Sequence, residues 1–236
     1  MKKLFIVGNW KSYKTLSQAK EWLEKFKDLH PQFSPEEKEV IVCPPFPFLS
    51  EMKKYIEENN LPIKLGVQDI SPFEEGAYTG AIFAKQAKEF VTHALVGHSE
   101  RRKYFHETDE DVLAKLKQLF AQEITPVLCI SDMKQLEFYL KEDDVLISNA
   151  DKIIFVYEPP SAISGGGAFH AADLKDIDVN TAEIGKMIGK NVITIYGGSV
   201  NPDNASTIFG LEHVQGGLPG QASLDAEKFV SIIKSI

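Results

Sequence analysis

The sequence predicts an α/β protein folded as a single (β/α)8 barrel, because short apolar runs alternate about eight times with helical patterns along its 236 residues. Most runs are continuously apolar and rich in β-branched residues, which is typical of strands buried on both faces of a parallel sheet. No Pro/Ser-rich linker, repeat or low-complexity segment marks a boundary, so we expect one domain over residues 1–236. An open, doubly wound sheet is the alternative.

Eight predicted strands follow one another along the chain. They are Leu4–Val7, Val40–Cys43, Ile63–Val67, Ala94–Val96, Pro126–Ile130, Ile153–Tyr157, Val192–Tyr196 and His213–Gln215. The last run carries the weakest apolar signal.

Helical patterns lie between the strands. Thr15 and Gln18 form a capping box before a first helix. Thr108, which three acids follow, begins another, and Ser223 opens the final one. The side chains expected to face the core are Leu16, Ala19, Leu23 and Phe26 in the first, Val112, Leu113, Leu116 and Phe120 in the second, and Ala226, Phe229, Val230 and Ile233 in the last.

The charge of the chain bears on its partners. A net charge of −8, with no basic cluster longer than residues 101–103, argues against a nucleic-acid surface. An anionic substrate would therefore need local positive charge from Lys11, helix N-termini and backbone N–H groups.

Cysteine usage and the start of the chain bear on location. Cys43 and Cys129 each follow a strand-like run, and without a CxxC motif we expect reduced core thiols. Lys2 and Lys3 followed by Leu4–Val7 are too short for a signal sequence or a membrane span. We expect a cytoplasmic protein that does not bind membranes.

Five polar or glycine positions share one relation to the predicted strands. Lys11, His98, Glu158, Ser199 and Gly220 all come just after a strand and never before one. In a barrel the C-terminal ends of the strands meet on one rim, where the chemistry of such folds lies. We therefore expect these residues to share one site.

Both arginines of the chain lie in the segment Val96–Arg102, while the other 24 of its 26 basic side chains are lysine. Such a bias indicates that the chain uses arginine only where a planar side chain with several hydrogen-bond donors is needed. His98 in this segment precedes the opening turn of a helix, which disfavours a cation and keeps an imidazole neutral. A structural ion pair beside a buried histidine is the alternative. A zinc site is not supported, because His98-Ser99-Glu100 lacks a P-C-x-x-C partner.

Glu158 is the candidate general base. It follows a strand and precedes two prolines that fix the departing backbone, and a carboxylate held against apolar surface is a stronger base. The alternative is a surface glutamate before a turn. Downstream, Ser164–Ala168 is typical of a hinged lid over a ligand.

Lys11 and Asn9 lie two residues apart, so on a strand both side chains would point into the barrel mouth and Trp10 into the core. We expect Glu100 to orient Lys11 through an ion pair. Gly197-Gly198-Ser199 and Gly220-Gln221 are candidate phosphate loops, since glycines let backbone N–H groups approach an anion. The chain has no P-loop and no G-x-G-x-x-G, which argues against a nucleotide.

Five motifs in this order resemble the triosephosphate isomerase family over nearly the whole chain. They are Gly8–Lys11, Val96–Arg102, Tyr157–Pro159, Tyr196–Val200 and the Gly-rich stretch Gly216–Leu224. The resemblance implies the TIM-barrel fold and interconversion of dihydroxyacetone phosphate and D-glyceraldehyde 3-phosphate through an enediol(ate), in glycolysis and gluconeogenesis. It also implies that no cofactor and no metal is used.

Residue roles follow from the same resemblance. It implies that Asn9 and Lys11 bind substrate, that His98 polarises the carbonyl group and that Glu158 moves the proton between two carbons. The implied phosphate contacts are Ser164 in the lid, Ser199, Gly220 and Gln221, and the supporting residues are Glu100, Tyr196, Gly197 and Gly198. Gly76–Gly80, around Thr79, is similar to the loop with which one subunit reaches its partner, which implies a homodimer.

The chain departs from the family pattern mainly in the lid, residues 159–169. Ser161 stands where tryptophan is usual, and Ser164 and Gln221 stand where glycine is usual. The segment between Cys129 and Glu158 is also short, with Ser131-Asp132 in place of Gly-Glu. These departures leave a non-catalytic phosphate-binding barrel as an alternative. An aldolase on the same barrel would need a desolvated Schiff-base lysine.

Overall fold

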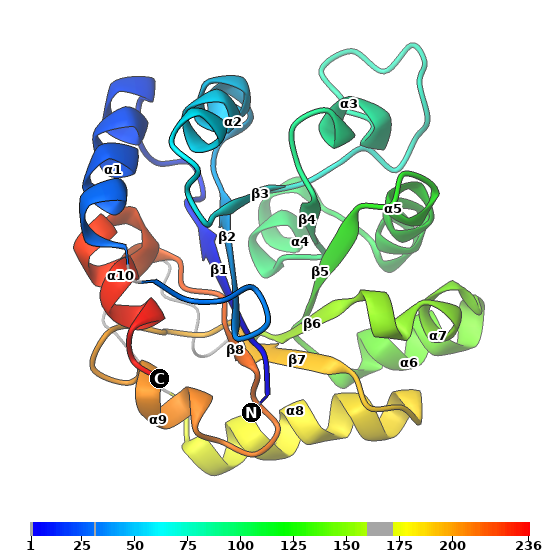
Figure 1. Cartoon of the computed structure of the whole chain (residues 1–236). Helices are drawn as coiled ribbons and strands as arrows, with labels where there is room; N and C mark the ends of the chain where they lie inside the picture. Colours follow the sequence, from blue (N-terminus) through cyan, green and yellow to red (C-terminus); the bar gives the residue numbers. More distant parts are fainter. Residues whose placement is uncertain (1, 31, 160–171) are drawn as a thin grey trace.

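The computed structural model describes residues 2–30, 32–159 and 172–236, which form a closed barrel of parallel strands (Figure 1). Each strand pairs with the next along the chain, and β8 pairs with β1 to close the ring. The predicted (β/α)8 barrel is therefore confirmed, and the open-sheet alternative is wrong.

The first seven strands overlap the runs predicted for them. The strands are β1 (Leu4–Asn9), β2 (Lys38–Cys43), β3 (Lys64–Val67), β4 (His93–Val96), β5 (Thr125–Ile130), β6 (Ile154–Tyr157), β7 (Ile193–Tyr196) and β8 (Gly216–Gly217).

The prediction of the last strand at His213–Gln215 is wrong, because β8 consists of Gly216 and Gly217. Gly216 has φ +132°, and a Cβ there would lie 2.0 Å from the carbonyl oxygen of Phe5 on β1. Only glycine permits this approach, which closes the barrel. Glycine is depleted in strands generally, so residue propensities do not predict a strand at Gly216–Gly217.

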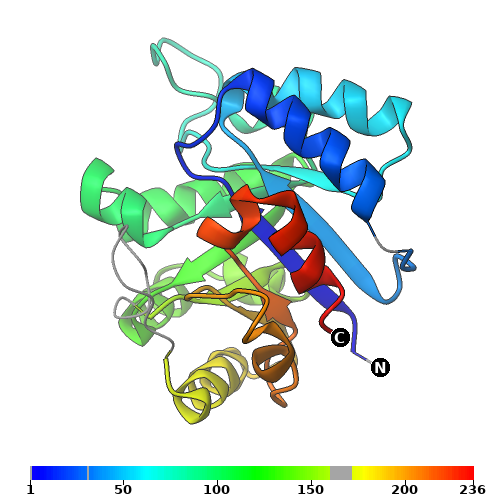
Figure 2. The same cartoon turned by 90° about the vertical axis from the view of Figure 1, so that its left-hand side faces the viewer.

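Helices surround the barrel. They are α1 (Leu16–Leu29), α2 (Leu49–Glu58), α3 (Ala84–Lys88), α4 (Ser99–Phe105), α5 (Asp109–Ala121), α6 (Met133–Glu142), α7 (Val145–Ser148), α8 (Leu174–Ile188), α9 (Ala205–Phe209) and α10 (Ala226–Ile233), with short 3-10 helices η1 (Phe46–Phe48), η2 (Ala150–Lys152) and η4 (Gln221–Leu224). Figure 2 shows α1 beside α10, with the two termini close together.

The predicted helix starts are confirmed in two of three cases. Thr15 forms the capping box of α1, and Thr108 caps α5. Ser223 does not open α10; Asp225 does, by accepting a hydrogen bond from the Lys228 backbone N–H. The Ser223 hydroxyl instead donates to Gly220 O at 2.7 Å, which holds the 3-10 turn before the helix. Of the side chains expected to face the core, Leu16 and Phe120 are half-buried and the rest are buried.

The barrel interior is apolar over most of its length. The buried residues that fill it are Phe5, Val7, Ile41, Cys43, Leu95, Val127, Cys129, Ile154, Val156, Ile195 and Leu218. Both cysteines are free, as predicted, and burial raises the pKa of each thiol. Between residues 2 and 236, leaving aside positions 31 and 160–171, no helix combines the length and hydropathy needed to span a membrane.

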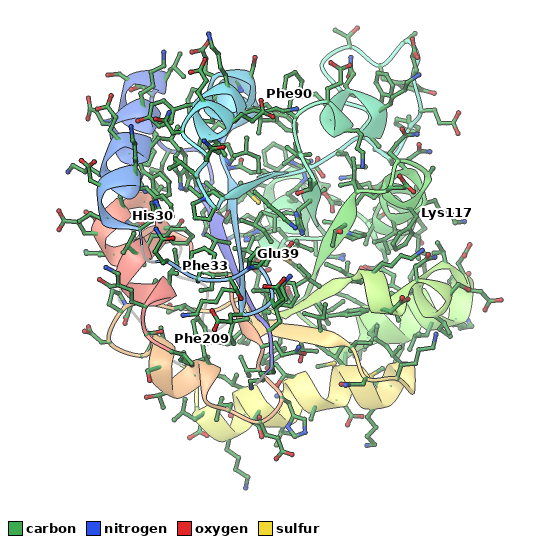
Figure 3. The ribbon with its side chains drawn as sticks, in the orientation of Figure 1. His30, Phe33, Glu39, Phe90, Lys117 and Phe209 are labelled. Atoms are coloured by element: carbon green, nitrogen blue, oxygen red, sulfur yellow. The ribbon has the colours of Figure 1, made fainter. Side chains whose placement is uncertain are left out.

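Charged side chains close the N-terminal end of the barrel. Glu39 lies two residues before Ile41 on β2, so it faces the same interior, and Figure 3 labels it near the middle of the ring of strands. Its carboxylate lies 3.1 Å from His93 Nε2 and 2.6 and 2.8 Å from the ammonium groups of Lys3 and Lys64. Burial raises the pKa of Glu39, but hydrogen bonds from these three side chains outweigh burial and hold it well below its usual value. Burial lowers the pKa of His93.

These shifts predict how stability depends on pH. The Glu39 pKa is depressed in the folded state, so its contribution is present above the unfolded value of about 4.3 and is lost as pH falls further. His93 acts in the same direction, because below about pH 6.5 the unfolded chain binds its proton more readily. We expect Glu39→Gln to lower the free energy of unfolding by about 2 kcal/mol at pH 7, since charge-assisted hydrogen bonds are lost.

Urea unfolding at pH 7 and at pH 4 measures the difference in free energy of unfolding between the parent and Glu39→Gln. This difference should be smaller at pH 4. Glu58→Gln is the control, because that carboxylate makes only a surface pair, 3.9 Å from Lys54. A Glu39→Gln effect no larger than that of Glu58→Gln would contradict the prediction.

Candidate active site

The predicted site residues meet in one cavity of about 510 Å³ at the C-terminal ends of the strands. Those that line it are Asn9, Lys11, His98, Glu158, Gly197, Gly198, Ser199, Gly220 and Gln221. The expectation of a single rim is thus confirmed. Ser164 and the rest of the predicted lid from residue 160 onward lie outside the described residues.

Lys11 reaches the cavity by a turn and not by strand alternation. β1 ends at Asn9, and Lys11 has a left-handed backbone with φ +50°. Three hydrogen bonds fix this turn: Asn9 Oδ1 accepts from Lys11 N at 3.0 Å, and Gln68 Nε2 donates to the carbonyl oxygens of Lys11 and Cys43 at 2.8 and 2.9 Å. Trp10 is fully buried, as expected. Gln68 was not among the predicted site residues, although it too follows a strand directly.

Glu100 forms the predicted ion pair with Lys11, with Oε1 2.6 Å from Nζ. Glu100 is the second residue of α4, where a carboxylate is favoured by the helix dipole. The ammonium group of Lys11 is therefore held over the cavity from one side by a partner on another element.

His98 and Glu158 face each other from just beyond the ends of β4 and β6. His98 Nε2 lies 2.9 Å from Glu158 Oε1, and Glu158 Oε2 accepts from Ser99 N at 3.0 Å. The Glu158 side chain is only 1% exposed. His98 Nδ1 accepts from Glu100 N at 3.2 Å, so the hydrogen bonds assign the imidazole proton to Nε2, which faces Glu158.

Two influences on the pKa of His98 oppose each other. Burial lowers it, but the charge and hydrogen bond of Glu158 outweigh burial, with a further contribution from Glu100, and the pKa is raised. Whether the His98 ring is neutral, as the sequence predicts, therefore depends on the charge of Glu158. When that carboxylate takes up a proton, the main cause of the raised pKa is removed, and burial at a helix N-terminus favours the neutral ring.

The glycines after β7 are required by close packing. A Cβ on Gly197 would lie 2.5 Å from Val156 Cγ1, and one on Gly198 would lie 2.0 Å from the hydroxyl oxygen of Tyr196. Gly197 N donates to Tyr157 O at 2.8 Å, so this N–H extends the β-ladder and does not face a ligand. Burial raises the pKa of Tyr196 to about 12. Gly197 and Tyr196 thus fix the backbone of the loop after β7 by packing and hydrogen bonding.

The opposite wall of the cavity comes from η4 and the start of α10. A Cβ on Gly220 would lie 3.2 Å from Lys11 Cε, so glycine here makes room for the lysine stem. Asp203, Asp225 and Lys228, which were not predicted site residues, also line the cavity. Within the described ranges, no three His, Cys, Asp or Glu side chains gather as a metal site would require.

Comparison with known proteins gives a match over almost the whole chain. The family model described as triosephosphate isomerase matches residues 4–236. The triosephosphate isomerase of Trichodesmium erythraeum is 37% identical over 99% of both chains. Those of Picosynechococcus sp. and Thermus thermophilus are 36% and 34% identical, over 100% and 99% of both chains. The match runs from β1 to α10, and so includes every strand end that lines the cavity.

Proposed function

The chain belongs to the triosephosphate isomerase family and is an isomerase that interconverts dihydroxyacetone phosphate and D-glyceraldehyde 3-phosphate, and we propose that Glu158, His98 and Lys11 carry out this reaction. The observation that supports the assignment is the 2.9 Å approach of His98 Nε2 to Glu158 Oε1 in the cavity that Lys11 also lines. A proton acceptor and a hydrogen-bond donor that follow different strands are thus held side by side, as removal of a proton from carbon beside a polarised carbonyl group requires.

In the proposed reaction, Glu158 takes a proton from the carbon next to the carbonyl group. The C–H electron pair forms the carbon–carbon double bond of an enediolate, and the carbonyl electrons move to oxygen. His98 Nε2–H donates a hydrogen bond to that oxygen, and the Lys11 ammonium group stabilises its negative charge. The hydroxyl proton on the first carbon passes to the enediolate oxygen, and the oxygen that it leaves re-forms a carbonyl group as the carbon–carbon double bond opens. Protonated Glu158 returns its proton to the neighbouring carbon, which completes the isomerisation.

The phosphate group is assigned to the other side of the same cavity. We propose that Ser199, Gly220 and Gln221 hold it, with Asn9 contacting the substrate beside Lys11. All three residues line the cavity that Lys11, His98 and Glu158 line, which supports this assignment. Ser164 stays in the proposal on the resemblance alone. Glu100, Tyr196, Gly197 and Gly198 have supporting roles, because each fixes a neighbour and not the substrate.

No observation favours the non-catalytic alternative. Isomerisation of D-glyceraldehyde 3-phosphate in D2O tests the proton-transfer mechanism directly. We expect turnover, with solvent deuterium at C1 of the dihydroxyacetone phosphate formed, because a carboxylate exchanges its proton with water between the two steps. Proton NMR measures the incorporation. Turnover without deuterium would contradict the role of Glu158 as an exchanging base, and binding without turnover would support the non-catalytic barrel.

We propose a homodimer formed through the loop around Thr79. Residues 73–81 are exposed, and within them Phe73 and Tyr78 stack with ring centroids 4.3 Å apart while each is nearly half exposed. Figure 1 shows the segment between β3 and α3 extending away from the barrel. An ordered aromatic pair at an exposed tip is typical of a surface that a partner covers.

Sedimentation should give about twice the chain mass of 26.4 kDa at micromolar concentration. We expect Tyr78→Asp to shift the protein toward monomer, because a carboxylate would be buried without a partner. Val179→Asp on α8, also at an exposed apolar side chain, is the control and should leave the mass unchanged. A Tyr78→Asp protein that sediments like the parent would contradict the proposed interface.

Two wider assignments belong to the same proposal. Residues 1–236 are taken as one catalytic domain, which the closed ring from β1 to β8 supports. The cytoplasm is the proposed location, supported by the free thiols of Cys43 and Cys129, since reducing compartments keep cysteines unpaired.

A further inference from the structure

Gly97 is the residue on which the position of His98 depends. Its φ is +72°, and a glycine can adopt this backbone conformation but is not held in it by its own sterics. The carbonyl oxygen of Gly97 lies in the peptide plane that contains the backbone nitrogen and Cα of His98. Whatever fixes that oxygen therefore fixes the attachment point of the imidazole.

Two charged side chains hold Gly97 from opposite ends. Arg102 Nε donates to Gly97 O at 3.0 Å, and Gly97 N donates to Glu107 Oε1 at 3.0 Å. Both peptide planes that flank this flexible residue are thus restrained. The side chains supply a rigidity that the glycine backbone lacks.

Arg102 is itself anchored on two neighbouring helices. Nη1 donates to Asp109 Oδ1 at 2.7 Å at the start of α5, and Nη2 donates to the hydroxyl of Tyr139 on α6. The Tyr139 hydroxyl in turn donates to Asp109 Oδ1 at 2.9 Å, and its side chain is fully buried. The three guanidinium nitrogens thus each donate to a fixed acceptor, which is the forked geometry that lysine cannot supply.

We propose that Arg102, held by Tyr139 and Asp109, is a positioning residue that fixes the Gly97–His98 peptide and so aims His98 Nε2 at the substrate carbonyl group. The inference rests on the proposed role of His98 as electrophile. Arg102 lies outside the residues that line the cavity and acts only through Gly97.

The guanidinium group crowds any side chain that would replace the hydrogen atom at position 97. A Cβ on Gly97 would lie 3.2 Å from Arg102 Nη2 and 3.2 Å from Cys129 O. The absence of a side chain at Gly97 therefore makes room for the guanidinium group. Through Arg102 on α4, the hydroxyl of Tyr139 on α6 is linked to the carbonyl oxygen of Gly97 after β4. This explains why the chain places one of its two arginines here.

The experiment compares Arg102→Lys and Tyr139→Phe in the full chain. Lys keeps the positive charge but not the fork, and Phe keeps the buried ring but not the hydroxyl. Each variant is measured for kcat, KM and the 15N resonances of His98, which the His98→Gln spectrum assigns. Lys103→Ala is the matched control, because Lys103 is exposed on the same helix and its ammonium group lies over the Tyr104 ring.

We expect Arg102→Lys to lower kcat by about 10- to 100-fold with KM nearly unchanged, since misplacing a catalytic group by about 1 Å has an effect of this size. Tyr139→Phe should lower kcat by about 3- to 10-fold, because Arg102 keeps its other partners. In both variants the Nε2 resonance of His98 should shift or broaden. Lys103→Ala should match the parent.

A lower melting temperature with unchanged kcat and an unchanged His98 resonance would overturn the proposal, since the contacts would then be structural only. A change in kcat without a change in the resonance, or the reverse, would overturn it as well. If Arg102→Lys does not fold, Tyr139→Phe decides by the same two readouts. A fully active His98→Gln would instead contradict the electrophile assignment, and the resonances would still report whether Arg102 positions the ring.

Discussion

Glu158→Gln lowers kcat by about 10²- to 10⁴-fold, because an amide cannot take up the proton that a carboxylate base removes from substrate. The replacement has the same shape, and its carbonyl oxygen can still accept from Ser99 N, which now lies 3.0 Å from Glu158 Oε2. KM should change much less than kcat. Initial rates of D-glyceraldehyde 3-phosphate isomerisation measure both constants, with Glu58→Gln as the control for loss of a carboxylate.

The same variant also tests the coupling between the two central residues. Glu158 is the main reason that the pKa of His98 is raised, so its replacement by an uncharged amide should lower that pKa. A 15N titration would then show His98 staying neutral to a lower pH than in the parent. A loss of kcat smaller than about tenfold would contradict the assignment of Glu158 as the base.

The part of the site that follows strand ends could be predicted from the sequence. Apolar runs locate the strands, and a barrel brings their C-terminal ends together, so His98 and Glu158 were expected in one cavity. Their mutual 2.9 Å contact depends on the register between β4 and β6, which both pair with β5, and no local pattern encodes it.

Tertiary contacts decided the features that the sequence did not predict. β8 consists of two glycines because a Cβ on Gly216 would lie 2.0 Å from Phe5 O and one on Gly217 would lie 2.9 Å from the Phe209 ring. Neither glycine carries an apolar signal. Ser223 and Asp225 are equally good caps by type, but the carbonyl oxygen of Gly220 engages the serine and leaves the helix to the aspartate. Local propensity cannot rank such alternatives, because the deciding partner lies outside the helix.

The contacts around the two arginines illustrate a third limit. The scarcity of arginine among 26 basic side chains predicts forked contacts, and the structure has them. Arg101 Nε lies 2.6 Å from Glu107 Oε2, and Arg101 Nη2 lies 2.8 Å from Asp69 Oδ2. What the sequence could not supply was the identity of the acceptors. Tyr139 lies 37 positions from Arg102 on another helix, so only the fold brings them together.

Lys11→Met lowers kcat/KM by about 10²- to 10³-fold, the effect typical of removing one preorganised group that stabilises transition-state charge. The chain has a net charge of −8, and the cavity is lined by the carboxylates of Glu158, Asp203 and Asp225, so an anionic substrate enters against its field. Among the residues described as lining the cavity, the cationic side chains are Lys11 and Lys228. Methionine nearly preserves the length of the stem and is no more strained than lysine at φ +50°.

Lys228→Met tests whether the effect of Lys11 comes from its positive charge alone or from the position of that charge. Both variants remove one positive charge from the same cavity, but Lys228 is exposed at its outer edge while Lys11 is half-buried and held by Glu100 at 2.6 Å. We expect Lys228→Met to change KM by only a few-fold at low salt and to match the parent at high ionic strength, where exposed charges are screened. The loss in Lys11→Met should persist at high salt, because its charge acts at contact distance. Equal effects of the two variants would mean that net charge alone attracts the substrate, and that the left-handed turn at Lys11 has no catalytic purpose.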